Sequence, residues 1–228
     1  DNQIFCLDTK DGSKIWNVFS ISSFIKSQNL MSLAVSKKGN LVAINSAADL
    51  LNINTDDGKV YWSINTSESL YADAADFFKS SDIVITGEEI IFSSASSIFS
   101  YNLNKGSVNW KTEVTSVAAP IINGKNIFIV TENGYFIIIN RDTGKIISST
   151  NILRILKKRK QKTKITGFIM GSGKIYSVTL NGNLIVSSAI SGKVEYFKKI
   201  GDPITTTPII NDGKLYILTE NSRIIGLN

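Results

Sequence analysis

The 228-residue sequence predicts an all-β fold, a β-propeller built from four-stranded antiparallel blades. Three observations predict it. A glycine-centred turn recurs at intervals of 38 to 48 residues, at Gly12, Gly58, Gly106, Gly144 and Gly192. An aromatic residue stands four positions after four of these glycines, namely Trp16, Trp62, Trp110 and Tyr196, and we expect these side chains to pack between blades. Short runs rich in β-branched residues fill the intervals, and four short strands in about 45 residues are typical of a propeller blade.

A second repeat supports the first. Residues Pro120–Asn133 align without gaps to Pro208–Asn221, with eight of fourteen positions identical at an offset of 88, which is two repeat lengths. A β-sandwich of about seven strands is the alternative fold, but it does not predict this recurrence.

The repeat that begins at Ala119 shows the elements of one blade in order. Pro120–Ile122 leads to an Asn-Gly turn, Ile127–Val130 to a turn that ends at Gly134, and Phe136–Ile139 to the turn at Gly144. Ile146 then opens the fourth strand. Each turn glycine supplies the positive φ of a tight turn. The middle runs are apolar throughout, which favours strands that are buried on both faces.

Applied along the chain, this pattern predicts a single propeller domain over residues 1–228 that starts within a blade. If the strands of a blade are lettered A to D in chain order, strands C and D lie at 1–19. Complete blades follow at about 32–65, 83–114, 119–150 and 165–200, and strands A to C end the chain at 204–228. We therefore expect about five blades' worth of chain, the C-terminal portion of a larger ring. A short helix is expected at 71–79.

Composition excludes several classes of site. Hydrophobic residues make up 43% and charged residues 19% of the chain, which excludes a disordered protein. The chain has no histidine, which removes histidine-based triads, general bases and metal ligands. Its single cysteine excludes an internal disulfide. We expect no catalytic residues and no metal site.

The net charge of +6 comes from one short run, since the other basic and acidic residues balance. The run comprises Lys157, Lys158, Arg159, Lys160, Lys162 and Lys164. It has no interleaved aromatic residues for base stacking, so we expect no nucleic-acid partner. A solvated loop is one interpretation. The functional interpretation is contact with an anionic surface or an acidic partner through Lys157, Lys158, Arg159 and Lys160.

The motif Leu-Asp/Asn-x-x-x-Gly-x-x-x-Trp resembles the repeat of the quinoprotein-type, or PQQ-like, propellers. Within them the chain is similar to the BamB family, whose members are propeller lipoproteins of the machinery that inserts barrel proteins into the bacterial outer membrane. The segment Ile152–Leu156 and the tail, Thr206–Tyr216 and Ile224–Asn228, carry this resemblance. Family members have eight blades, which implies about three further blades ahead of Asp1.

The resemblance implies a non-catalytic scaffold on the periplasmic face of the outer membrane. Its partner would be the POTRA domains of a BamA-like barrel protein, with unfolded outer-membrane proteins as further partners and membrane association through an N-terminal lipid anchor not present in this chain. A contact loop of the family matches Phe24, Ile25 and Lys26, with Ile25 as apolar anchor and Lys26 as cation. A second, acidic loop matches Asp76 and Asp82. The alternative is that all five are solvated loop residues.

Two other functions remain open. Pyrroloquinoline-quinone dehydrogenases share the blade repeat, but they need a bound quinone, a calcium ion and a catalytic aspartate, and many carry a vicinal cysteine pair. One cysteine cannot form that pair, and Asp56–Asp57 and Glu88–Glu89 fall in predicted turns, so we expect no cofactor. The third function is a propeller that binds another protein of the cell envelope.

Overall fold

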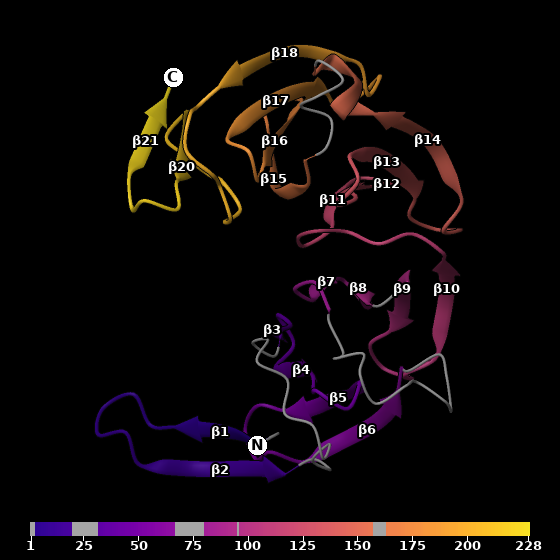
Figure 1. Cartoon of the computed structure of the whole chain (residues 1–228). Helices are drawn as coiled ribbons and strands as arrows, with labels where there is room; N and C mark the ends of the chain where they lie inside the picture. Colours follow the sequence, from indigo (N-terminus) through magenta and orange to yellow (C-terminus); the bar gives the residue numbers. More distant parts are fainter. Residues whose placement is uncertain (1–2, 20–31, 67–79, 95, 157–162) are drawn as a thin grey trace. The chain divides into compact units, whose positions relative to one another are not determined.

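The computed structural model of the chain describes residues 3–19, 32–66, 80–94, 96–156 and 163–228. These residues form antiparallel β-sheets and one short 3-10 helix, and the strands of each sheet follow one another in chain order (Figure 1). The chain divides into two units, Asp1–Lys111 and Thr112–Asn228. The expected helix at 71–79 lies outside the described residues. Among the described residues, no helix has the length and apolar character needed to cross a membrane.

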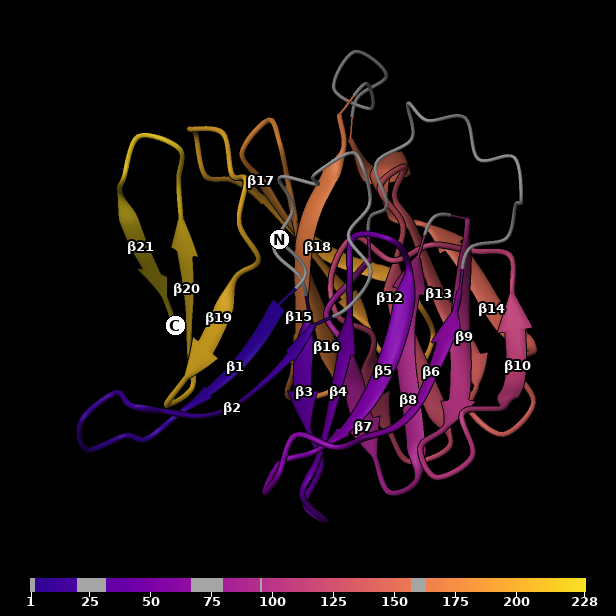
Figure 2. The ribbon, with the colours of Figure 1, turned by 90° about the horizontal axis from the view of Figure 1, so that it is seen from below.

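The first unit contains a two-stranded and two four-stranded sheets, whose strands run alongside one another (Figure 2). The two-stranded sheet pairs β1 (Gln3–Leu7) with β2 (Lys14–Phe19). The next comprises β3 (Leu33–Val35), β4 (Asn40–Ile44), β5 (Asp49–Asn54) and β6 (Val60–Asn65). The third comprises β7 (Val84–Thr86), β8 (Glu89–Ser94), β9 (Ser97–Asn102) and β10 (Val108–Thr112), which ends one residue beyond the unit.

The second unit contains two four-stranded sheets and a three-stranded one. The first comprises β11 (Ile121–Asn123), β12 (Asn126–Val130), β13 (Tyr135–Asn140) and β14 (Ile146–Asn151), and the helix η1 (Ile152–Ile155) follows it. The second comprises β15 (Ile165–Gly171), β16 (Lys174–Thr179), β17 (Asn183–Ser188) and β18 (Val194–Lys199). The third comprises β19 (Ile209–Asn211), β20 (Lys214–Leu218) and β21 (Ile224–Leu227).

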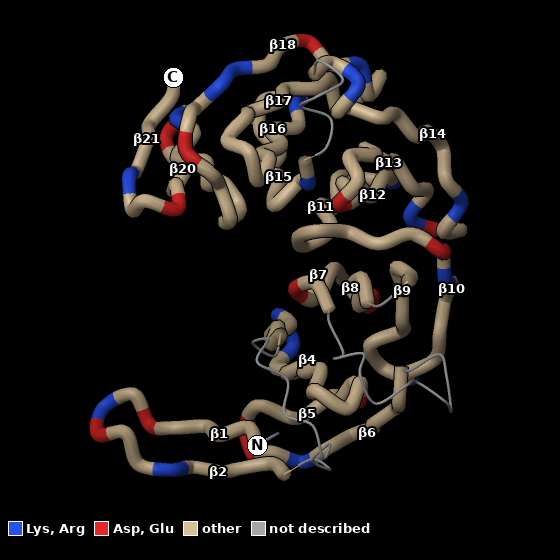
Figure 3. Tube along the Cα trace, in the orientation of Figure 1, with Lys and Arg blue, Asp and Glu red and all other residues tan. Residues whose placement is uncertain are grey.

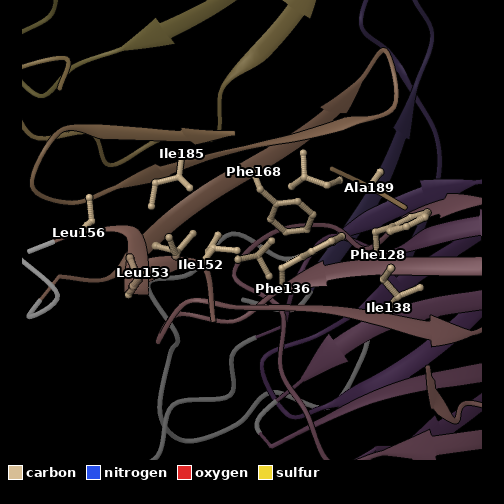
Figure 4. Close-up of a cluster of buried hydrophobic side chains, with 12 residues drawn as sticks. Phe128, Phe136, Ile138, Ile152, Leu153, Leu156, Phe168, Ile185 and Ala189 are labelled. Atoms are coloured by element: carbon tan, nitrogen blue, oxygen red, sulfur yellow. The ribbon is translucent and has the colours of Figure 1, made fainter. Parts of the chain in front are cut away.

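Within each unit, successive sheets pack face to face, which buries the apolar side chains of their middle strands. In β12 the residues Ile127 to Val130 are all at most 4% exposed. One face of β12 and β13 contributes Phe128 and Phe136, whose rings stack at 6.2 Å, to a core shared with Phe168 and Ile185 of the next sheet (Figure 4). Side chains on both faces of this strand are therefore buried, so its sequence is apolar throughout and does not alternate between apolar and polar residues.

The glycine turns of the sequence repeat share one hydrogen-bond pattern. Gly58 N donates to Asn54 O at 3.0 Å, and Asn54 N donates to Lys59 O at 2.9 Å. The Asn54 side chain closes the turn, since its Oδ1 accepts from Asp56 N at 2.8 Å. The same three contacts recur at the turns headed by Asp8, Asn102, Asn140 and Ser188, whose glycines all have φ between +68° and +73°. A short polar side chain four residues before the glycine is therefore part of the repeat.

The aromatic position of the repeat also has a structural explanation in the first unit. The Trp16 ring covers Gly58 of the next sheet, and its Nε1 donates to Thr55 O at 2.8 Å. The Trp62 ring covers Gly106 in the same way, and its Nε1 donates to Leu103 O at 2.9 Å. These tryptophans thus join one sheet to the next, as the sequence predicted.

Candidate partner-binding surfaces

Most of the predicted contact residues lie outside the described residues. These are Phe24, Ile25, Lys26, Asp76, Lys157, Lys158, Arg159 and Lys160. Asp82 is placed, and the ends of the connection that carries the basic run are placed at Leu156 and Thr163. The contacts proposed for the other residues stay predictions.

Asp82 is exposed on a backbone that is held at several points. It directly precedes Ile83, which is 6% exposed, and β7 begins one residue later. Ile83 N donates to Ser32 Oγ at 2.8 Å, Ser81 N donates to Ser93 O at 2.7 Å, and Ser93 N donates to Ser81 Oγ at 2.9 Å. The structure therefore holds the backbone on both sides of Asp82 and leaves its side chain exposed to solvent.

The helix η1 exposes one cation and one apolar side chain, while its other side chains are buried. Ile152, Leu153 and Leu156 are at most 4% exposed and belong to the core between two sheets (Figure 4). Arg154 is exposed, and Ile155 is 43% exposed. Asn151 caps the helix, since its Oδ1 accepts from Leu153 N at 3.0 Å. Sequence reasoning noticed this segment as part of the resemblance but assigned it no contact role.

Leu153 fixes the position of η1 against the preceding turn. It packs on Gly134, and a Cβ at that glycine would overlap Leu153 Cγ. Ile152 N also donates to Gly134 O at 2.9 Å. Because Gly134 has a φ of +85°, both backbone conformation and space require glycine there.

Tyr196 departs from the packing that the sequence predicted for it. The side chain is 52% exposed and lines a cavity of about 500 Å³ between the β15–β18 and β19–β21 sheets. Lys198 and Lys214 also line this cavity, as do Lys174 and Glu195, which form an ion pair of 3.1 Å. Trp16 and Trp62 of the first unit instead cover glycines in the turn after a sheet's third strand.

The carboxylates of the described residues do not converge. No group of three or more Asp, Glu, Cys or His side chains with the geometry of a metal site occurs among them. Glu88 instead pairs with Lys38 across two neighbouring turns at 3.1 Å. The hydrogen bonds from Lys38 and Asn104 and the charge of Lys38 lower the pKa of Glu88.

Comparison with known proteins identifies relatives of the whole chain. A family model described as "Outer membrane protein assembly factor BamB" matches residues 1–150, more than half of the chain. The BamB of Yersinia pestis is 24% identical over 97% of this chain and 58% of its own length. The BamB of Moranella endobia is 20% identical over 99% of this chain and 46% of its own length. The chain thus spans about half the length of the curated relatives it matches.

Among solved structures, the crystal structure of BamB from Moraxella catarrhalis superposes with a TM-score of 0.75 at 13% identity. The match covers 99% of this chain and 63% of that one. This likeness confirms the β-propeller fold that the sequence repeat predicted.

Proposed function

The chain belongs to the BamB family of outer membrane protein assembly factors, and we propose from this membership that it is a scaffold of the barrel-assembly machinery. Its task in this proposal is to bind the periplasmic POTRA domains of a BamA-like barrel protein. The observation that carries the proposal is the family match over residues 1–150, which includes both loops that the resemblance assigns to this contact.

In this proposal the two loops contribute different interactions. Ile25 supplies apolar contact area and Lys26 a cation, with Phe24 beside them. Asp76 and Asp82 supply anions for basic side chains of the partner. The exposed position of Asp82 on a hydrogen-bonded backbone supports this assignment, because a backbone that is already ordered loses little entropy on binding.

The proposed role is not enzymatic. The relatives are named as assembly factors, and the described carboxylates do not gather into a cluster that could hold a metal ion. In this proposal the protein acts on the periplasmic face of the outer membrane, where a lipid anchor holds it. Unfolded outer-membrane proteins are further partners in this proposal.

Calorimetric titration of the POTRA domains into the 228-residue chain tests the assigned residues. We compare the unchanged chain with an Ile25→Ala, Lys26→Glu double variant and with Asp82→Lys. Asp56→Lys serves as the control for Asp82→Lys, because Asp56 is also exposed but lies in a turn at the other end of the strands. Loss of binding in the first two variants with retention in the control supports the assigned loops.

Two other results would distinguish the scaffold function from the residues assigned to the contact. Binding that none of the variants weakens would retain the scaffold and reject the assigned residues. Absence of binding to POTRA domains, together with capture of a different envelope protein, would favour the alternative of a propeller module for another partner.

A further inference from the structure

We propose that Asn123 is a site of spontaneous deamidation, at which the folded protein acquires an aspartyl or isoaspartyl residue. Asparagine followed by glycine is the sequence in which this reaction is fastest, because glycine has no side chain to hinder its backbone nitrogen. The chain contains three such pairs, Asn123–Gly124, Asn133–Gly134 and Asn181–Gly182. The structure leaves only the first pair free to react. This modification is independent of POTRA binding, and either can fail while the other holds.

The reaction joins the backbone nitrogen of the glycine to the side-chain carbon of the asparagine. Gly124 N gives up its proton to hydroxide and attacks Asn123 Cγ, and the new C–N bond closes a five-membered succinimide ring. The side-chain nitrogen of Asn123 leaves as ammonia. Water then opens the ring at either of its two carbonyl carbons, which leaves an aspartyl or an isoaspartyl residue without oxidation or reduction. The glycine nitrogen must therefore be free to approach the side chain.

Hydrogen bonds engage the glycine nitrogen in two of the three pairs. Gly134 N donates to Thr131 O, and Gly182 N donates to Thr179 O, both at 2.9 Å. Gly124 N makes no hydrogen bond to any of the residues that the structure describes. An engaged N–H must first lose its acceptor before the nitrogen can attack, and the carbonyl left behind loses its partner. We therefore expect Gly124 to supply the most reactive nitrogen of the three.

Packing around the three glycines separates the pairs in the same way. Gly134 and Gly182 are buried, and a Cβ on them would overlap Leu153 Cγ and Asp202 O respectively. Gly124 is exposed, and a Cβ built on it would meet nothing within 4 Å. Formation of the ring turns the peptide plane of the glycine toward the asparagine side chain. The backbone has room for this movement at Gly124, whereas close neighbours oppose it at the other two glycines.

The side chain of Asn123 is also free to rotate. Asn123 is exposed at the end of β11, directly before the two-residue turn Gly124–Lys125 that leads to β12. Its amide makes no hydrogen bond to the described part of the chain. By contrast, Asn133 Oδ1 accepts a hydrogen bond from Thr131 Oγ1, which restrains that side chain. Both reacting groups of the first pair are thus unrestrained.

Deamidation would change both charge and backbone at the end of β11. Figure 3 colours acidic residues red and uncharged residues tan, and the reaction would convert Asn123 from the second class to the first. The isoaspartyl form also adds one carbon atom to the backbone. Asn123 pairs with Asn126 at the last position of the β11–β12 ladder, whereas Ile127, one position further in, is fully buried. We therefore expect the change to loosen the hairpin end and leave the sheet folded.

Peptide mapping of the folded 228-residue chain after incubation at mildly alkaline pH tests the proposal. Trypsin cleaves after Lys111 and Lys125, and the peptide Thr112–Lys125 contains Asn123 and no other asparagine or glutamine. We expect this peptide to gain the mass difference between an amide and an acid several-fold sooner than the peptides that contain Asn133 and Asn181. A sample digested before incubation corrects for deamidation during the digest.

Two controls separate the effect of the fold from that of the sequence. In denaturant the three pairs should deamidate at similar rates, because each is an Asn-Gly sequence without its packing or hydrogen bonds. Asn123→Gln should remove the first acidic form that ion exchange separates from the folded chain, since glutamine would have to close a larger ring. Asn133→Gln makes the same substitution at a protected pair and should leave that acidic form unchanged.

Two results would overturn the proposal. One is deamidation of Asn133 or Asn181 in the folded chain at a rate equal to or above that of Asn123. The other is a Thr112–Lys125 peptide that keeps its mass in the folded chain under conditions in which the same peptide deamidates in denaturant.

Discussion

The indole ring of Trp62 lies directly on the α-carbon of Gly106. A Cβ built on this glycine would be 2.9 Å from Trp62 Cδ2, closer than such atoms approach in proteins. The Trp62 ring is on β6, and Gly106 is in the turn between β9 and β10, so the contact joins two sheets. The pairing of aromatic residue and glycine that recurs in the sequence is therefore a contact between successive repeats and not within one.

Gly106→Ala should destabilise the chain more than Gly87→Ala. Both glycines belong to the β7–β10 sheet and have positive φ, +68° and +61°, so both substitutions carry a left-handed penalty of about 1–2 kcal/mol. A Cβ at Gly87 meets nothing within 4 Å, whereas one at Gly106 must displace Trp62. Chemical unfolding should show an extra loss of about 1–3 kcal/mol for Gly106→Ala. Equal losses would contradict the packing role of the ring.

Trp62→Phe and Asn52→Ala should be coupled. Leu103 O accepts from Trp62 Nε1 and from Asn52 Nδ2, both at 2.9 Å, within a residue that is fully buried. Either substitution leaves one donor, but the double variant leaves a buried carbonyl with neither. A double-mutant cycle on the free energy of unfolding should give a coupling of about 1 kcal/mol. Strictly additive losses would argue that the two donors do not depend on each other at Leu103 O.

Leu153→Ala should cost about 2–5 kcal/mol of stability, as truncation of a buried leucine does. Leu153 is 4% exposed, contacts Gly134 and belongs to the core of the second unit. Ile155→Ala is the matched control on the same helix, because Ile155 is 43% exposed and should cost well under half as much. Thermal unfolding of both variants measures these losses. Similar losses would show that the buried side of η1 contributes no more to stability than its exposed side.

The pKa of Glu88 should lie below the usual glutamate value of about 4.3 and should rise in Lys38→Met. Lys38 and Asn104 favour the charged carboxylate through hydrogen bonds, and Lys38 also through its charge. Since the folded-state pKa is lowered, the contribution to stability is present above the unfolded pKa and is lost as pH falls through the folded one. NMR titration of the Glu88 side chain measures both values. An unchanged Glu88 pKa in Lys38→Met would remove Lys38 as the cause.

The repeat allowed the strands to be predicted because each has a strong local signal. Ile127–Val130 and Phe136–Ile139 are apolar runs between glycine turns, and each became a buried middle strand. The role of Trp16 and Trp62 could be predicted as packing, but not the acceptor of their N–H groups, which is a backbone carbonyl about forty residues away in sequence. Local patterns contain no information on such a partner.

Two features of the candidate surfaces had no sequence signal of their own. Tyr196 occupies the same repeat position as Trp62, yet it is exposed and lines a cavity. Ile155 resembles its apolar neighbours Leu153 and Leu156, and only the burial of those two leucines shows that Ile155 is the side chain that faces solvent. Exposure at these positions depends on neighbouring sheets and not on local sequence.

The most direct measurement is the affinity of the 228-residue chain for the POTRA domains of a BamA-like protein, by biolayer interferometry with immobilised POTRA domains. The proposed scaffold role predicts saturable binding that an excess of unlabelled chain displaces. Absence of saturable binding at low salt and high protein concentration, from a chain whose unfolding remains cooperative, would contradict it.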